Sequence, residues 1–169
     1  DNKAIAYTEI RDLTTNCDEM NFRKLLERVI TTKEIAQRID VLFMFGDFLG
    51  FFPPRQSGIV LNVHVELLPL SSCEENEILT RVIKKCQNIE AIQLLCLDLV
   101  KLQILANNCL NLKTLVFECS DELALEAFRL ETKTHQTPCQ LSFIGSFILF
   151  SMTDHSTITA LLQKIMVHT

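Results

Sequence analysis

The 169-residue sequence contains no Trp, one Tyr, and only four Gly and four Pro. Because tight turns between strands depend on Gly and Pro, this scarcity disfavours a sandwich or barrel built from many hairpins. Hydrophobic residues make up 48% of the chain and charged residues 22%, which is a globular composition and not a disordered one. The composition therefore predicts a chain rich in helix or in regular α/β units.

Long apolar runs and clustered basic residues are also missing. The most apolar stretch, 141–152 (LSFIGSFILFSM), has 12 residues, whereas a membrane-spanning helix needs ~20, so we expect no membrane partner. The net charge is −5, and the basic residues are scattered in pairs such as Arg23/Lys24 and Lys84/Lys85. Nucleic-acid binding requires a concentrated positive face, so we expect no nucleic-acid partner.

Signs of secretion are absent too. The cysteines number seven, an odd count, and no Asn-x-Ser/Thr acceptor occurs, which favours reduced thiols in the cytoplasm or nucleus. The sequence begins with Asp1, so we expect it to be part of a longer polypeptide.

Common motifs for catalysis or cofactor binding are absent from the sequence. The sequence has no C-x-x-C, no G-x-G-x-x-G, no G-x-x-x-x-G-K-[ST] and no G-x-S-x-G. Its four histidines are dispersed, and His135 and Cys139, which are close in sequence, fall in an expected loop where we expect no functional role for the pair. We therefore expect no catalytic residue, no metal site and no cofactor, and a protein that is not an enzyme.

A 23-residue repeat is the strongest positive signal. KKCQNIEAIQLLC at 84–96 realigns with NNCLNLKTLVFEC at 107–119, including both Cys residues and one Asn. The matched positions are Leu79/Leu102, Val82/Leu105, Ile83/Ala106, Cys86/Cys109, Asn88/Asn111, Ile89/Leu112, Ile92/Leu115, Leu94/Phe117 and Cys96/Cys119. The repeat recurs in part at Leu125 and Phe128. Cysteines at repeated positions indicate small buried apolar side chains, not metal ligands.

Periodicity predicts the elements around this repeat. We expect helices at 19–30, 73–86, 98–108, 121–131 and 156–167, and a second, short helix that starts at Thr31 or Thr32. We expect strands at 40–45, 59–67, 89–96, 112–118 and 140–152. A capping box of Thr31 and Glu34 would begin the short second helix. Alternating strands and helices predict a single domain over 1–169 with a mainly parallel sheet, in which 1–38 form a helical N-terminal cap and 39–169 the α/β units.

The spacing L-x-x-L-x-L at 89–94 and 112–117 resembles leucine-rich repeats. LANNCLNLKTL at 105–115 is most similar to the cysteine-containing subtype found in F-box proteins, and Cys86 and Cys109 match that subtype's helix-end cysteine. The resemblance implies a short solenoid with parallel strands that binds a protein partner. For an F-box-like protein, it implies an adaptor or substrate receptor of a ubiquitin ligase, although 1–38 contain no F-box-like motif.

Two candidate surfaces follow. Strand residues between the inward positions are expected to face outward and contact the partner, namely Ala91, Gln93, Leu95, Thr114, Val116 and Glu118. The loop 45–58 (FGDFLGFFPPRQSG) carries Phe48, Phe51 and Phe52, which would either contact a partner or cover one end of the core. The expected function is a non-enzymatic protein-interaction module. The alternatives are a scaffold subunit of a larger complex and an α/β enzyme with an unrecognised site.

Overall fold

The computed structural model describes residues 19–45, 58–63, 65, 68–118, 126, 139–144, 147–152 and 157–168. Within these residues the chain is an α/β protein with five helices and six strands. It divides into two compact units, 1–89 and 90–169. The expected single domain over 1–169 stays a prediction, as does the helix at 121–131, which lies outside the described residues except at 126.

Unit 1 contains the helices α2 (Glu19–Thr31), α3 (Lys33–Ala36) and α4 (Ser72–Lys85) and the strands β1 (Ile39–Phe43) and β2 (Ile59–Asn62). The strands pair in parallel, with Ile39 opposite Ile59. Strand β2 ends at Asn62, so the predicted strand 59–67 was too long, whereas the predicted helix 73–86 lies within one residue of α4 at each end.

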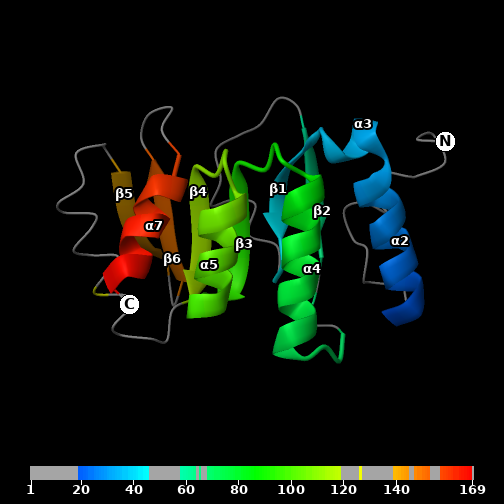
Figure 1. Cartoon of the computed structure of the whole chain (residues 1–169), viewed down its shortest axis with the longest axis horizontal. Helices are drawn as coiled ribbons and strands as arrows, with labels where there is room; N and C mark the ends of the chain where they lie inside the picture. The colour runs from blue at the N-terminus through cyan, green and yellow to red at the C-terminus, as the bar shows by residue number, and fades with distance from the viewer. Residues whose placement is uncertain are drawn as a thin grey trace. The chain divides into compact units, whose positions relative to one another are not determined.

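Helices α2 and α4 lie alongside one another in unit 1 (Figure 1). The apolar side of α2, which the sequence predicts, is buried at Phe22, Leu26, Val29 and Ile30. Two ion pairs join α2 to α4: Arg23 Nη2 lies 3.0 Å from Glu74 Oε2, and Arg81 forms a bidentate ion pair with Glu27. These pairs are about half exposed, so burial of the apolar side contributes most of the stability.

The helix starts in unit 1 differ from one another. Helix α4 begins with a capping box, in which Ser71 Oγ accepts from Glu74 N at 3.2 Å and Glu74 Oε1 accepts from Ser71 N at 3.2 Å. The capping box predicted for Thr31 and Glu34 was wrong. Thr31 instead donates its hydroxyl back to Glu27 O at 2.6 Å, and Thr32 is the N-cap of α3 without a side-chain cap bond.

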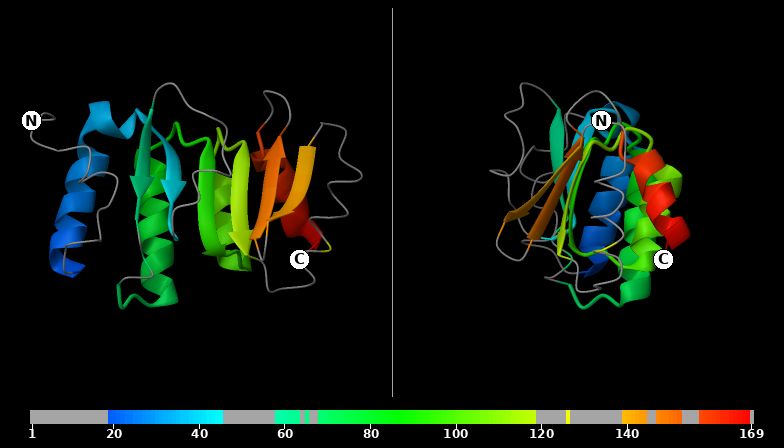
Figure 2. Two further views of the ribbon diagram at one scale, coloured as in Figure 1. Left: turned by 180° about the vertical axis from the view of Figure 1, so that it is seen from behind. Right: turned by 90° about the vertical axis from the view of Figure 1, so that its left-hand side faces the viewer.

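Unit 2 contains the strands β3 (Ala91–Cys96), β4 (Thr114–Glu118), β5 (Cys139–Ile144) and β6 (Phe147–Met152) and the helices α5 (Leu99–Asn108) and α7 (Thr159–His168). Its strands form a mixed sheet in the order β3-β4-β6-β5. Helices α5 and α7 lie on the same face of that sheet (Figure 2).

The register of β3 and β4 reproduces the repeat. These two strands are parallel, and residues 23 positions apart are direct partners: Ala91 with Thr114, Ile92 with Leu115, and Gln93 with Val116. The repeated apolar side chains from Leu79 to Phe117 are buried, each at most 4% exposed, except Cys96, which is partly exposed. The expectation of a buried thiol was therefore wrong at Cys96, and Cys119 lies outside the described residues. Ile92 and Leu115, which the 23-residue repeat aligns, therefore lie on neighbouring strands.

The end of unit 2 departs from the predicted parallel sheet. The stretch 140–152, expected as one strand, forms the antiparallel pair β5–β6, in which Ile144 lies opposite Phe147. Strand β6 also pairs antiparallel with β4. A run of 13 residues is longer than most strands, which span roughly 3–10 residues, and Gly145 in its middle is the sequence signal for a break.

Candidate functional site

The repeated cysteines lie at equivalent places in the two repeats. Cys86 is the C-cap of α4 with φ −107° and ψ 75°, and Cys109 is the C-cap of α5 with φ −95° and ψ 85°. In each case the cysteine N–H donates to the carbonyl four residues back, on Val82 or Leu105. The same backbone conformation thus turns the chain from each helix toward the strand that follows.

Both thiols are buried. Cys86 is 1% and Cys109 4% exposed, and burial raises the pKa of each thiol from its ordinary 9.0 to about 12. Such a thiol stays protonated at neutral pH, and the thiolate is the form that attacks electrophiles and binds metals. These two side chains act as small apolar groups at the ends of the helices.

Three of the six strand residues expected to face outward are buried. Ala91 is 7% exposed, and Gln93 and Val116 are fully buried. The expectation of alternating exposure was wrong at these positions, because the strands carry buried side chains on both faces, as parallel strands covered on both sides do. Their assignment to a partner-binding surface stays a prediction, and it now requires that the groups covering these three side chains be displaced.

The other three positions retain contact with solvent. Leu95 is 42% exposed, while Thr114 and Glu118 are partly exposed. Leu95 and Glu118 each lie near the carboxyl end of their strand, β3 and β4, where Cys96 is the register partner of Glu118 and Leu97 N donates to Glu118 O at 3.3 Å.

The first turn of α5 adds two exposed apolar residues that sequence reasoning missed. Leu99 is 48% and Val100 is 51% exposed. Asp98 fixes the start of this helix, because its Oδ1 accepts from Lys101 N at 2.8 Å while its Oδ2 lies 3.3 Å from Lys101 Nζ. We name Leu95, Leu99, Val100 and Glu118 the β3–α5 surface.

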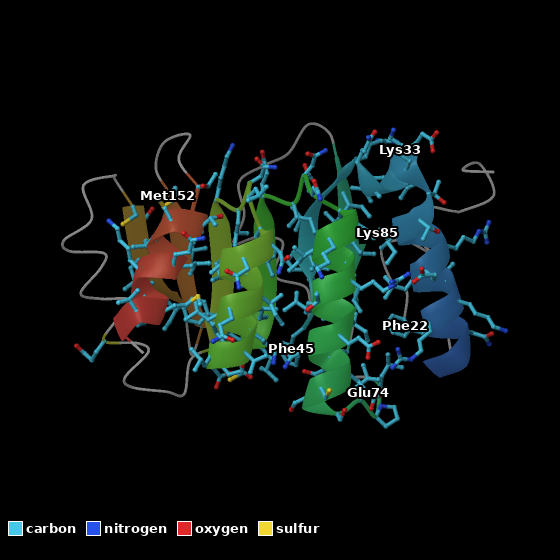
Figure 3. All side chains as sticks on the ribbon, viewed as in Figure 1. Phe22, Lys33, Phe45, Glu74, Lys85 and Met152 are labelled. Carbon is cyan, nitrogen blue, oxygen red and sulfur yellow. The ribbon has the colours of Figure 1, made fainter. Side chains whose placement is uncertain are left out.

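The second predicted surface lies outside the described residues at Phe48, Phe51 and Phe52. Phe45, the first aromatic of that loop, is described and partly buried (Figure 3). Three of the histidines, His64, His135 and His155, also fall outside the described residues.

Pockets lie among the described residues of unit 1. One, of about 540 Å³, runs along α4, where Asn76, Thr80 and Arg81 contribute to its lining. The other, of about 440 Å³, lies where α3 meets the end of α4. Among the described residues no group of three or more His, Cys, Asp and Glu is placed to hold a metal ion.

Comparison of the chain with models of protein families, with curated protein sequences and with solved structures found no match. None of the helices in the described part of the chain is long and apolar enough to cross a bilayer.

Proposed function

We propose that the chain is a non-enzymatic protein-interaction module built from leucine-rich-repeat-like units, in the cytoplasm or nucleus. The 23-residue register of β3 and β4 and the matching C-caps at Cys86 and Cys109 support a repeat architecture. In this proposal α2 and α3 form the N-terminal cap of a short solenoid, and repeat units stack so that each buries the apolar side of the next.

The β3–α5 surface is the proposed contact with the partner. Six large apolar side chains are exposed among the described residues, and three of them, Leu95, Leu99 and Val100, fall within six consecutive positions. Each is about half exposed, so covering all three would contribute ~3 kcal/mol, taking half of the ~1.5–3 kcal/mol for a whole side chain. This concentration of exposed apolar residues is the observation that carries the proposal.

Affinity capture with matched variants tests the proposal. Leu95→Arg and Leu99→Arg place a charge on the β3–α5 surface, whereas Leu110→Arg places the same charge on a residue 65% exposed beyond the other end of α5. We expect recovery of the partner to fall about tenfold or more for the first two variants and to stay unchanged for the third. Equal recovery with all three variants would remove the β3–α5 surface from consideration.

The identity of the captured proteins separates the remaining hypotheses. Recovery of ubiquitin-ligase components with the full-length protein supports the adaptor or substrate-receptor role that the F-box-like resemblance implies. A fixed stoichiometric assembly supports a scaffold subunit instead.

A further inference from the structure

The 440 Å³ pocket of unit 1 has an unusual lining for an acidic chain. Its described lining residues include three lysines and no carboxylate: Ile30, Thr31, Lys33, Ala36, Gln37, Lys84, Lys85, Gln87 and Asn88. We name it the lysine pocket. Lys33 lies on α3 and Lys85 at the end of α4, 52 residues later in the chain (Figure 3). The fold thus concentrates positive charge that the sequence distributes between two elements.

The carboxylate of Glu27 is held chiefly by Arg81, and Lys85 acts on it only through its charge. Glu27, on the last turns of α2, has its pKa lowered first by its hydrogen bonds with Arg81 and only then by the charges of Arg81 and Lys85. Both carboxylate oxygens of Glu27 are bound by Arg81. Within the described part of the chain, Lys33, Lys84 and Lys85 form no ion pair closer than 4.0 Å.

Neutralising the helix ends does not account for three lysines. Helices α2 and α4 both end at this pocket, and each carboxyl end carries roughly half a negative charge. Three ammonium groups against two such ends leave about two positive charges unmatched. Lys84 and Lys85 in the last turn of α4 exceed the half charge at that helix end, and Lys33 exceeds the half charge at the end of α2.

The pocket is also held in shape without a ligand. Asn88 Nδ2 donates to Gln37 O at 2.9 Å, which ties the turn after α4 to the end of α3. Gln37 N donates in turn to Lys33 O at 3.0 Å. Ile30 and Ala36 are at most 4% exposed and provide an apolar base, next to which an ion pair is screened less than in open water.

We propose that the lysine pocket binds a small anion that carries clustered phosphate groups. Its volume of about 440 Å³ lies within the ~300–1,000 Å³ range of small-molecule sites and exceeds what a single phosphate requires. Three ammonium groups supply point charges for phosphate oxygens, and the side-chain amide of Gln37 is an additional donor. The clustered phosphates belong either to a soluble molecule or to a lipid headgroup. This proposal does not depend on the proposed function above.

Titration calorimetry with pyrophosphate tests the site. We expect saturable binding that weakens about tenfold or more in Lys33→Gln and in Lys84→Gln, one lysine from each side of the pocket, because each loses a charge-assisted contact. Lys24→Gln is the matched control, since Lys24 is exposed on α2 and removes the same charge outside the pocket. Thermal unfolding of each variant without ligand verifies that it is folded.

A second arm distinguishes the two sources. Vesicles of phosphatidylcholine with and without a bisphosphorylated inositol lipid are sedimented with the protein. Sedimentation that depends on the inositol lipid, on Lys33 and on Lys84 assigns a headgroup, and pyrophosphate binding without sedimentation assigns a soluble ligand. The proposal is overturned if neither probe binds at up to ~1 mM, or if Lys24→Gln loses as much affinity as the pocket variants.

Discussion

Replacing Cys109 by serine tests whether the repeated cysteines are apolar groups of the core. The Cys109 thiol is 4% exposed, so the hydroxyl of Cys109→Ser would be buried in the same surroundings. A buried hydroxyl without a good partner costs about 1–3 kcal/mol, whereas Cys109→Ala loses only the sulfur and its contacts, about 1 kcal/mol. We therefore expect serine to destabilise unit 2 more than alanine does, an order opposite to that of a hydrogen-bonding site.

The same burial gives a pH dependence with a definite sign. The pKa of Cys109 is raised to about 12 in the folded chain, so between 9.0 and about 12 the unfolded chain loses its proton first. The contribution of this thiol to the free energy of unfolding is complete below pH 9.0 and is lost as pH rises toward 12. The loss is about 1.4 kcal/mol per pH unit in this window, and Cys109→Ser should lack this part of it.

Urea unfolding followed by circular dichroism, at neutral pH and at about pH 10, measures both effects. Cys73→Ser is the matched control, because Cys73 is exposed and its replacement should change the free energy of unfolding by less than about 0.5 kcal/mol. Alkylation under native conditions, with each modified cysteine located by mass spectrometry, adds an independent reading. If Cys109 reacts as fast as Cys73, or if the two serine variants are equally stable, the thiol is not enclosed and the reasoning fails.

Two further predictions concern the pairing of β3 with β4 and the start of α4. Ile92→Ala and Leu115→Ala should each lower the free energy of unfolding by about 2–5 kcal/mol, as measured by urea titration. Because the two residues are register partners, the effect of the double variant should deviate from the sum of the single effects by about 0.5 kcal/mol or more. Strict additivity would contradict their contact. Ser71→Ala should destabilise α4 by about 1 kcal/mol through loss of its capping box, as measured by thermal unfolding against Ser72→Ala, and equal effects would show that the cap contributes nothing.

The buried half of the repeat could be predicted from the sequence. Burial imposes the same requirement on each copy, so Leu79 and Leu102 or Ile92 and Leu115 keep apolar side chains 23 positions apart. The register of β3 and β4 follows from that spacing, because strands one repeat apart pair in phase. The cap at Ser71 was not predicted, although Ser-x-x-Glu in 71–74 carries the signal for it.

The lysine pocket could not be predicted in the same way. Lys33 lies 51 positions before Lys84, and both line one pocket. The sequence around a lysine at a helix end does not show whether another lysine, distant in the chain, lies near it in the fold. The antiparallel β5–β6 pair was missed because the apolar residues of 140–152 favoured one buried strand, although Gly145 in the middle of this run carries the signal for a break.

The burial of Gln93 changes how a recognition surface on this chain should be sought. A sheet face open to a partner would expose Gln93 and Val116, which are register partners, yet both are fully buried. An arginine at Gln93 would therefore destabilise the fold and could not report on binding, since it would leave a charge without water. What β3 offers to solvent is its carboxyl end, where Leu95 precedes the exposed first turn of α5. We therefore expect a partner that binds the repeat to contact that end of the strand, where the exposed Leu95 follows the buried residues of β3.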